Sequence, residues 1–231
     1  MKSFFKGQCI LLFTILGVLN ISAQSTATKG WLSDKEKITL FTPAFNEQME
    51  IEYPIFKAFK YSDNGGDNLF VFTEHAYAKQ TDDSLNDKIK GHFIQRKKGE
   101  DWKQVVTVRD LKTEGEENIW FWTKYSVFED ADKDGIIDPI VVYGSSDPDN
   151  GRSEGRLKII VIYKGAKVFI RHQNSIMDND RITQVDKAFY QLPKAIQKRV
   201  QKLIKDIADK DLALFAHTIL SDMDKGKTSI N

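Results

Sequence analysis

The side chains with the most distinctive chemistry lie in one acidic stretch, FEDADKDGIIDPIVVYG, at residues 128–144. From Asp130 it follows the pattern D-x-D-x-D-G-x-x-D, which places acidic residues at alternate positions and a glycine at the sixth. Calcium takes six to eight oxygen ligands, and a tight loop supplies them when alternate side chains point inward and a glycine permits the sharp turn. We therefore predict a calcium site. Its predicted ligands are Asp130, Asp132, Asp134, Asp138 and the backbone carbonyl of Ile136.

Electrostatics favours a bound ion at this loop. Carboxylates that are held close together raise one another's pKa, which destabilises the fold when no cation is present. A divalent cation removes that repulsion, and calcium suits the loop better than magnesium, which keeps several waters in an octahedral shell. The alternative interpretation is a solvated acidic turn that binds no ion.

The loop is similar to two known kinds of calcium loop. It resembles an EF-hand only in part, because Val141 stands at the twelfth position, where an EF-hand has a bidentate glutamate. It more closely resembles the strand-loop-strand calcium loops of integrin-type propeller repeats, in which the aspartate at the ninth position completes the shell. That resemblance is confined to the loop and implies a site, not a fold.

The elements that position this loop are predicted to be short strands. From residue 55 to residue 172, runs rich in β-branched and aromatic residues alternate with Gly, Asp and Asn, which indicates about eight strands. Glycine-containing links at 62–68, 97–101 and 163–167 predict hairpins and therefore antiparallel pairing. Both faces of 118–128 are apolar, which favours a central strand covered on both sides. The predicted strands are residues 55–61, 68–78, 88–98, 101–110, 118–128, 139–144, 156–164 and 167–172.

Helices are predicted at the C-terminal end, over about 183–215. Thr183 and Asp186 resemble a capping box that opens a short helix to about Gln191, and Pro193 stands where a second helix would start. The second helix carries one apolar stripe, formed by Ile196, Val200, Leu203, Ile204 and Ile207. The predicted fold is α+β, a mainly antiparallel β domain with a C-terminal helical segment.

The N-terminal residues indicate export. Lys2 and Lys6 precede an apolar run over 10–19 and a small-residue exit at Ser22-Ala23, the order of a secretory signal peptide. We expect a signal peptide over 1–23, a flexible lead-in over 24–35, a single domain over 36–220 and a frayed tail over 221–231. The protein is then periplasmic or extracellular, with no transmembrane anchor after cleavage.

Composition limits the partners and the means of stabilisation. Removing residues 1–23 takes two of the 34 basic residues and none of the 33 acidic ones, which leaves 32 against 33 and a net charge of −1. A near-neutral chain gives no electrostatic argument for nucleic acid. The single cysteine, Cys9, is lost with the signal peptide, so a core or a metal must hold the exported domain.

Three tracts resemble a known group of proteins. They are WTKYSVFEDADKDGIIDPIVVYG, GRLKIIVIYKGAKVFIRHQN and QVDKAFYQLPKAIQKRVQKLI, within roughly residues 115–215. They are similar to a group of exported bacterial proteins that are labelled surface polysaccharide biosynthesis proteins. The resemblance implies a role in the cell envelope, in making or displaying polysaccharide, and carries over no catalytic residue.

Two functions follow from these observations. The first is an exported, calcium-stabilised cell-envelope protein with a binding or accessory role, whose partner is an envelope glycan or an envelope protein. The alternative is a secreted or periplasmic glycan hydrolase with a carboxylate pair as acid and base. Its candidate carboxylates are Glu74, Asp147 and Asp149, and no pair stands out among them. We favour the non-enzymatic function.

Overall fold

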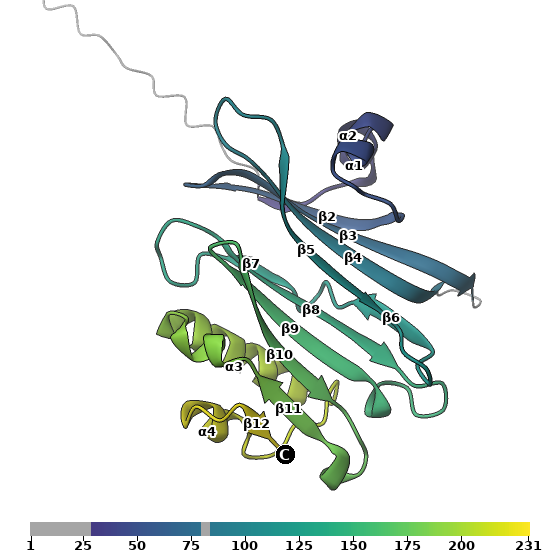
Figure 1. Ribbon diagram of the computed structural model, residues 1–231, viewed down its shortest axis with the longest axis vertical. Coiled ribbons are helices and arrows are strands. Elements are labelled where there is room, and N and C mark those ends of the chain that lie inside the picture. Colours follow the sequence, from purple (N-terminus) through teal and green to yellow (C-terminus); the bar gives the residue numbers. More distant parts are fainter. Residues whose placement is uncertain (1–28, 80–83) are drawn as a thin grey trace, which may run out of the picture.

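The protein is built from two antiparallel sheets that stack face to face, with helices on the outer faces (Figure 1). The computed structural model describes residues 29–79 and 84–231. The predicted signal peptide, and residues 24–28 of the predicted lead-in, lie outside the described residues. The mainly antiparallel α+β fold expected from the sequence is confirmed.

The first sheet has the order β1-β2-β3-β4-β5, so that consecutive strands are neighbours. The glycine-containing links between β2 and β3 and between β4 and β5 are hairpin turns, as the sequence predicted. The strands are β1 (Gly30–Trp31), β2 (Ile55–Asp63), β3 (Gly66–Lys79), β4 (Ser84–Arg96) and β5 (Lys103–Leu111).

The second sheet has the order β12-β11-β10-β9-β8-β6, with β7 also paired to β8. The link between β9 and β10 is the third predicted hairpin. The strands are β6 (Asn118–Phe121), β7 (Val127–Glu129), β8 (Asp138–Ser146), β9 (Arg156–Tyr163), β10 (Ala166–Gln173), β11 (Ile182–Val185) and β12 (Ser229–Ile230).

The strand predicted over 118–128 is split into β6 and β7, which pair with different halves of β8. A turn separates them, in which the amide of Tyr125 donates to the carbonyl of Trp122 at 2.8 Å. The turn keeps contact with β8, because the amide of Val142 donates to the Ser126 hydroxyl at 3.1 Å. Both faces of this segment contact core residues, but β6 lies at the end of the sheet and is not a central strand.

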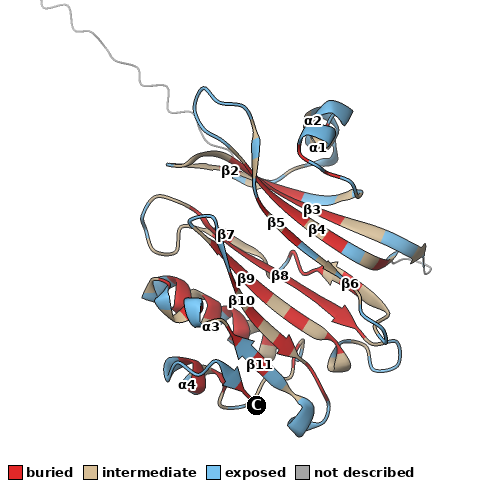
Figure 2. Cartoon of the chain, in the orientation of Figure 1, coloured by how far each residue is buried: buried red, intermediate tan, exposed pale blue. Residues whose placement is uncertain are grey.

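Three apolar layers hold the fold together, and Figure 2 shows the buried residues along both sheets. An aromatic-rich layer between the sheets includes Phe70, Phe72 and Phe128. A second layer lies between the second sheet and the C-terminal helices, and a third lies between the first sheet and the N-terminal helices. Strand β8 serves two layers, since Val141 faces the first sheet and Val142 faces the helices.

The helices are α1 (Asp34–Leu40), α2 (Pro43–Gln48), α3 (Lys194–Ala208) and α4 (Ile219–Asp224). Helix α3 follows Pro193, and its five stripe residues are all buried, as predicted. No helix within 29–79 or 84–231 combines the length and apolar composition that crossing a membrane requires.

The short helix predicted from Thr183 is wrong. Residues 182–185 form β11, and residues 187–191 form a 3₁₀ helix. The two expected capping residues instead form hydrogen bonds with β10. The Thr183 hydroxyl bonds His172 Nδ1 at 2.8 Å, and Asp186 accepts from the amide of Phe169 at 2.9 Å. Both ends of the described chain are also folded further than expected, because β1 pairs with β2 and β12 pairs with β11.

Candidate metal centre

The acidic loop joins β7 to β8, and it brings together three of the four predicted aspartates. Asp130, Asp132 and Asp138 each offer a carboxylate oxygen, and these oxygens all lie within 4.8 Å of one another. Asp138 is the first residue of β8 and is only 2% exposed, whereas Asp130 and Asp132 are half-buried. Asp134 lies outside this trio and faces Lys164, whose Nζ is 3.9 Å from Asp134 Oδ2.

Backbone amides fix the aspartates on the inside of the turn. Asp130 accepts from the amides of Asp134 at 3.1 Å and Gly135 at 3.0 Å. Asp134 in turn accepts from the amide of Ile136 at 2.9 Å. The glycine is required here, because its φ is 87° and a Cβ at this position would lie 1.9 Å from Asn64 Nδ2. The glycine at the sixth position of the pattern therefore permits the sharp turn, as the sequence predicted.

Asp138 is the electrostatically strained member of the trio. Burial, together with the neighbouring charges of Asp132, Asp134 and Asp130, raises the pKa of its carboxyl to about 7. The hydrogen bond from the amide of Ala131, at 3.3 Å, opposes this shift only in part. Among the described residues, no lysine, arginine or histidine forms an ion pair with Asp138. A buried carboxylate between two others is the arrangement that a cation would relieve.

The turn between β2 and β3 clamps the acidic loop, which the sequence did not indicate. Asp63 Oδ2 accepts from the amide of Ile137 at 3.0 Å, and its Oδ1 accepts from the amide of Gly65 at 2.8 Å. The amide of Asn64 donates to the carbonyl of Gly135 at 3.0 Å. The loop of the second sheet is thus tied to a hairpin of the first. Only the turn-forming composition of SDNGGDN marked this segment, and composition does not reveal a partner so distant in sequence.

Two further contacts hold the outer side of the loop. The hydroxyl of Tyr163, the last residue of β9, donates to Asp132 Oδ2 at 3.2 Å. Arg199 of α3 donates from Nε to Glu129, the residue that precedes the loop, and so offsets one of its acidic charges. The remaining negative charge is therefore concentrated on the aspartates.

A buried hydroxyl lies near the same charges. Tyr61 of β2 is fully buried, and its hydroxyl has no hydrogen-bond partner among the described residues. Burial and the charges of Asp63 and Asp138 raise the pKa of this phenol. Tyr61 therefore stays protonated beside the acidic loop.

The carboxylates considered for a hydrolase lie elsewhere. Asp147 caps its own loop, since its Oδ1 accepts from the amides of Asp149 and Asn150 at 2.9 Å each, and Asp149 is exposed. Glu74 of β3 is half-buried and accepts from the amide of Phe121 at 2.9 Å and from Asn86 Nδ2 at 3.0 Å. Burial raises the pKa of the Glu74 carboxyl to about 7. Glu74 lines a groove together with residues of β2, β4 and β6.

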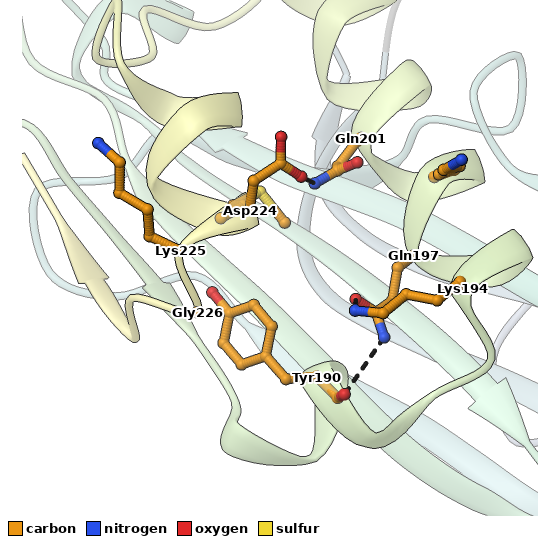
Figure 3. A pocket seen from close by; sticks show the side chains of 9 residues that line it. Tyr190, Lys194, Gln197, Gln201, Asp224, Lys225 and Gly226 are labelled. Atoms are coloured by element: carbon orange, nitrogen blue, oxygen red, sulfur yellow. Dashed lines mark hydrogen bonds between the residues drawn. The ribbon is translucent and has the colours of Figure 1, made fainter.

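A small hollow of about 260 Å³ lies between α3 and the C-terminal segment (Figure 3). Two of its polar side chains join elements around it: Gln201 Nε2 of α3 donates to Asp224 Oδ1 of α4 at 2.8 Å, and Gln197 Nε2 of α3 donates to the carbonyl of Tyr190 at 3.2 Å. The first bond holds α4 against α3, and the second ties α3 to the 3₁₀ helix that precedes it. The hollow therefore belongs to the packing of the C-terminal helices.

The trio of Asp130, Asp132 and Asp138 could hold a metal ion. Carboxylate oxygens are hard ligands, which suit calcium, magnesium and manganese better than softer metals. No protein-family model, curated protein or solved structure matches the chain.

Proposed function

We propose that the acidic loop binds calcium, and that the protein is an exported cell-envelope protein whose fold the ion stabilises. The observation that supports this most strongly is Asp138, a buried carboxylate held against Asp130 and Asp132 without a cationic partner among the described residues. Calcium accepts irregular oxygen shells, whereas magnesium needs a near-ideal octahedron and keeps its waters. An irregular loop with clustered carboxylates therefore suits calcium.

An ion at this loop would stabilise more than the loop itself. The loop leads into β8, which serves both the layer between the sheets and the layer beneath α3. The clamp from Asp63 and Asn64 joins the same loop to the first sheet. Anything that binds the folded state alone stabilises it by mass action. For an exported chain without cysteine, such an ion takes the place that disulfides hold in other secreted domains.

We propose a binding or accessory role in surface polysaccharide biosynthesis or display. The resemblance of the tracts between residues 115 and 215 supports the envelope location. Glu74 and Asp147 support binding over hydrolysis, because both carboxylates already accept hydrogen bonds that hold strands or loops in place. A glycoside hydrolase needs a carboxylate pair on either side of the scissile bond.

The contact of Tyr163 with Asp132 allows a direct test of the site. Terbium(III) replaces calcium in oxygen-ligand sites, and a phenol next to the ion transfers excitation energy to it. We expect terbium emission on tyrosine excitation, loss of that emission on adding calcium, and no emission from Asp132→Asn. Asp101→Asn, which removes an exposed acid outside the loop, is the matched control and should emit like the wild type. Emission that survives Asp132→Asn would refute the assignment. Fractionation of cells that produce the protein tests export separately.

A further inference from the structure

A groove lies at the opposite end of the β2–β3 hairpin from the acidic loop. It has a volume of about 550 Å³, within the range of ligand sites. Phe56 and Asp63 are seven residues apart on β2, which places the groove about 23 Å from the clamp at about 3.3 Å per residue. The groove is therefore separate from the metal centre. Its lining residues are Phe56, Glu74, Ser84, Asn86, Asn118, Trp120 and Arg152.

Strand β6 lies beside the first sheet (Figure 1) and contacts β4, and the groove is lined by residues of both. Among the described strands β6 pairs with β8 alone, so its other edge faces β3 and β4. Side chains link that edge to the first sheet: Glu74 of β3 accepts from the amide of Phe121, and Asn118 Oδ1 of β6 accepts from the amide of Asn86 in β4 at 2.8 Å. These bonds fix Glu74, Asn86 and Asn118 in place before any ligand arrives, which lowers the entropy cost of binding.

The lining combines aromatic surface with mixed polar groups. Phe56 is 45% exposed, a large apolar surface for a side chain of β2, and Trp120 is half-buried. Glu74 and the two asparagines add oxygen acceptors and amide donors, and Arg152 adds a guanidinium. Arg152 is exposed and forms no ion pair with any described residue. The groove thus presents aromatic rings beside groups that both donate and accept hydrogen bonds.

We infer that this groove binds a neutral sugar residue of a glycan. A pyranose has C–H bonds on its faces, which pack against aromatic rings, and hydroxyls at its rim, which both donate and accept. Each Glu74 oxygen has a lone pair beyond the bond that it already accepts. When Glu74 is ionised, its charge offsets that of Arg152, so the lining does not select an anionic ligand. This inference rests on the proposed binding role, because it names the ligand class for that role. It does not depend on the calcium loop.

The experiment uses the exported chain, residues 24–231, with maltotetraose, cellotetraose, mannotetraose and chitotetraose as neutral probes and oligogalacturonate as the acidic comparison. Protein-detected NMR follows the indole N–H of Trp120 and the carboxamide of Asn118. At least one neutral probe should shift both signals, and Phe56→Ala and Arg152→Ala should each weaken that binding about tenfold, the loss of about 1.4 kcal/mol. Arg109→Ala, an exposed arginine of β5, is the matched control and should bind as the wild type does.

The possible failures are distinct from one another. If no neutral probe shifts these signals, or if Phe56→Ala and Arg152→Ala bind like the wild type, the groove is not a sugar site. Stronger binding of oligogalacturonate would overturn the choice of a neutral ligand, and shortened probes on chromatography would overturn binding in favour of hydrolysis. The groove variants should keep the calcium-dependent melting shift of the wild type. A groove variant that loses sugar binding but keeps the calcium-dependent melting shift would show that the sugar binds at the groove and not at the acidic loop. A wild type that shows the melting shift but binds no sugar would overturn the groove inference and leave the calcium proposal standing.

Discussion

Asp132→Asn should change the stability of the protein in opposite directions with and without calcium. Asparagine has nearly the same shape as aspartate and keeps one oxygen, so the substitution mainly removes a charge. Asp132 shares the trio with Asp130 and Asp138, whose oxygens lie within 4.8 Å. Two unit charges at 4.8 Å repel by about 0.9 kcal/mol in water and by about 3.5 kcal/mol at an effective dielectric constant of 20.

The size of the effect without metal follows from these values. Asp132 is half-buried, so the repulsion energy in water, about 0.9 kcal/mol per pair, suits it better than the value at a dielectric constant of 20. Removing its repulsion with both Asp130 and Asp138 then stabilises the fold by about 2 kcal/mol. Weakening the hydrogen bond from the Tyr163 hydroxyl costs about 1 kcal/mol. In chelator at pH 8 we therefore expect Asp132→Asn to be more stable than the wild type by about 1 kcal/mol.

Calcium should reverse that order. Exported calcium modules bind with dissociation constants of about 0.1–1 mM. At about 10 mM calcium the wild type then gains about 1.4–2.7 kcal/mol, while the variant gains little. The assay is urea denaturation of both proteins in chelator and in calcium, with Asp101→Asn as the control for a lost charge. If the loop is a solvated acidic turn, the unfolding free energies of Asp132→Asn and the wild type should differ by less than about 0.5 kcal/mol both in chelator and in calcium. That result would refute the reasoning.

Three other substitutions test separate parts of the structure. Asp63→Ala should lower the free energy of unfolding, measured by urea denaturation, by about 2–4 kcal/mol and weaken calcium binding, because the amides of Ile137 and Gly65 lose a charged acceptor. An unchanged free energy of unfolding would show that the clamp does not stabilise the fold. Gly135→Ala should lower the free energy of unfolding by at least about 1 kcal/mol, since alanine disfavours a φ of 87°. Gly99→Ala is the control, because Gly99 also has a positive φ but open space around it, so its substitution measures the backbone strain alone. Burial lowers the pKa of His172 to about 4, so the unfolded chain takes up a proton below pH 6.5 that the folded chain does not, and stability falls with decreasing pH. The wild type should lose about 2 kcal/mol more than His172→Gln between pH 7 and pH 5, and parallel pH profiles would contradict the assignment.

The sequence predicted the local features of the candidate site well. Alternation of aspartates with a glycine at the sixth position is a property of a few consecutive residues. Of the predicted ligands, the structure brings Asp130, Asp132 and Asp138 together and leaves Asp134 outside the trio. The hairpins were also predictable, since short glycine-containing turns admit only antiparallel neighbours. The apolar stripe of α3 was predictable because helical periodicity marks the buried face directly.

Features that depend on distant residues could not be predicted in this way. Asp63 contacts Ile137 across the two sheets, and no pattern along the chain connects them. Thr183 and Asp186 carry the local signature of a helix start, but bonds to His172 and Phe169 outweigh that preference and produce a strand. The groove likewise combines residues of β2, β3 and β4 with residues of β6 and with Arg152, which reach the first sheet only when the two sheets pack.

The most direct test of the claim that the acidic loop binds calcium is a thermal melt of residues 24–231 in chelator, in about 10 mM calcium and in magnesium at the same concentration. Calcium binding at about 0.1–1 mM predicts a gain of about 1.4–2.7 kcal/mol, which raises the melting temperature by roughly 3–10 °C for a domain of this size. Magnesium should give a clearly smaller shift, because the loop does not offer an octahedral shell. Equal melting temperatures in chelator and in calcium would contradict the account and leave the aspartates as a solvated turn.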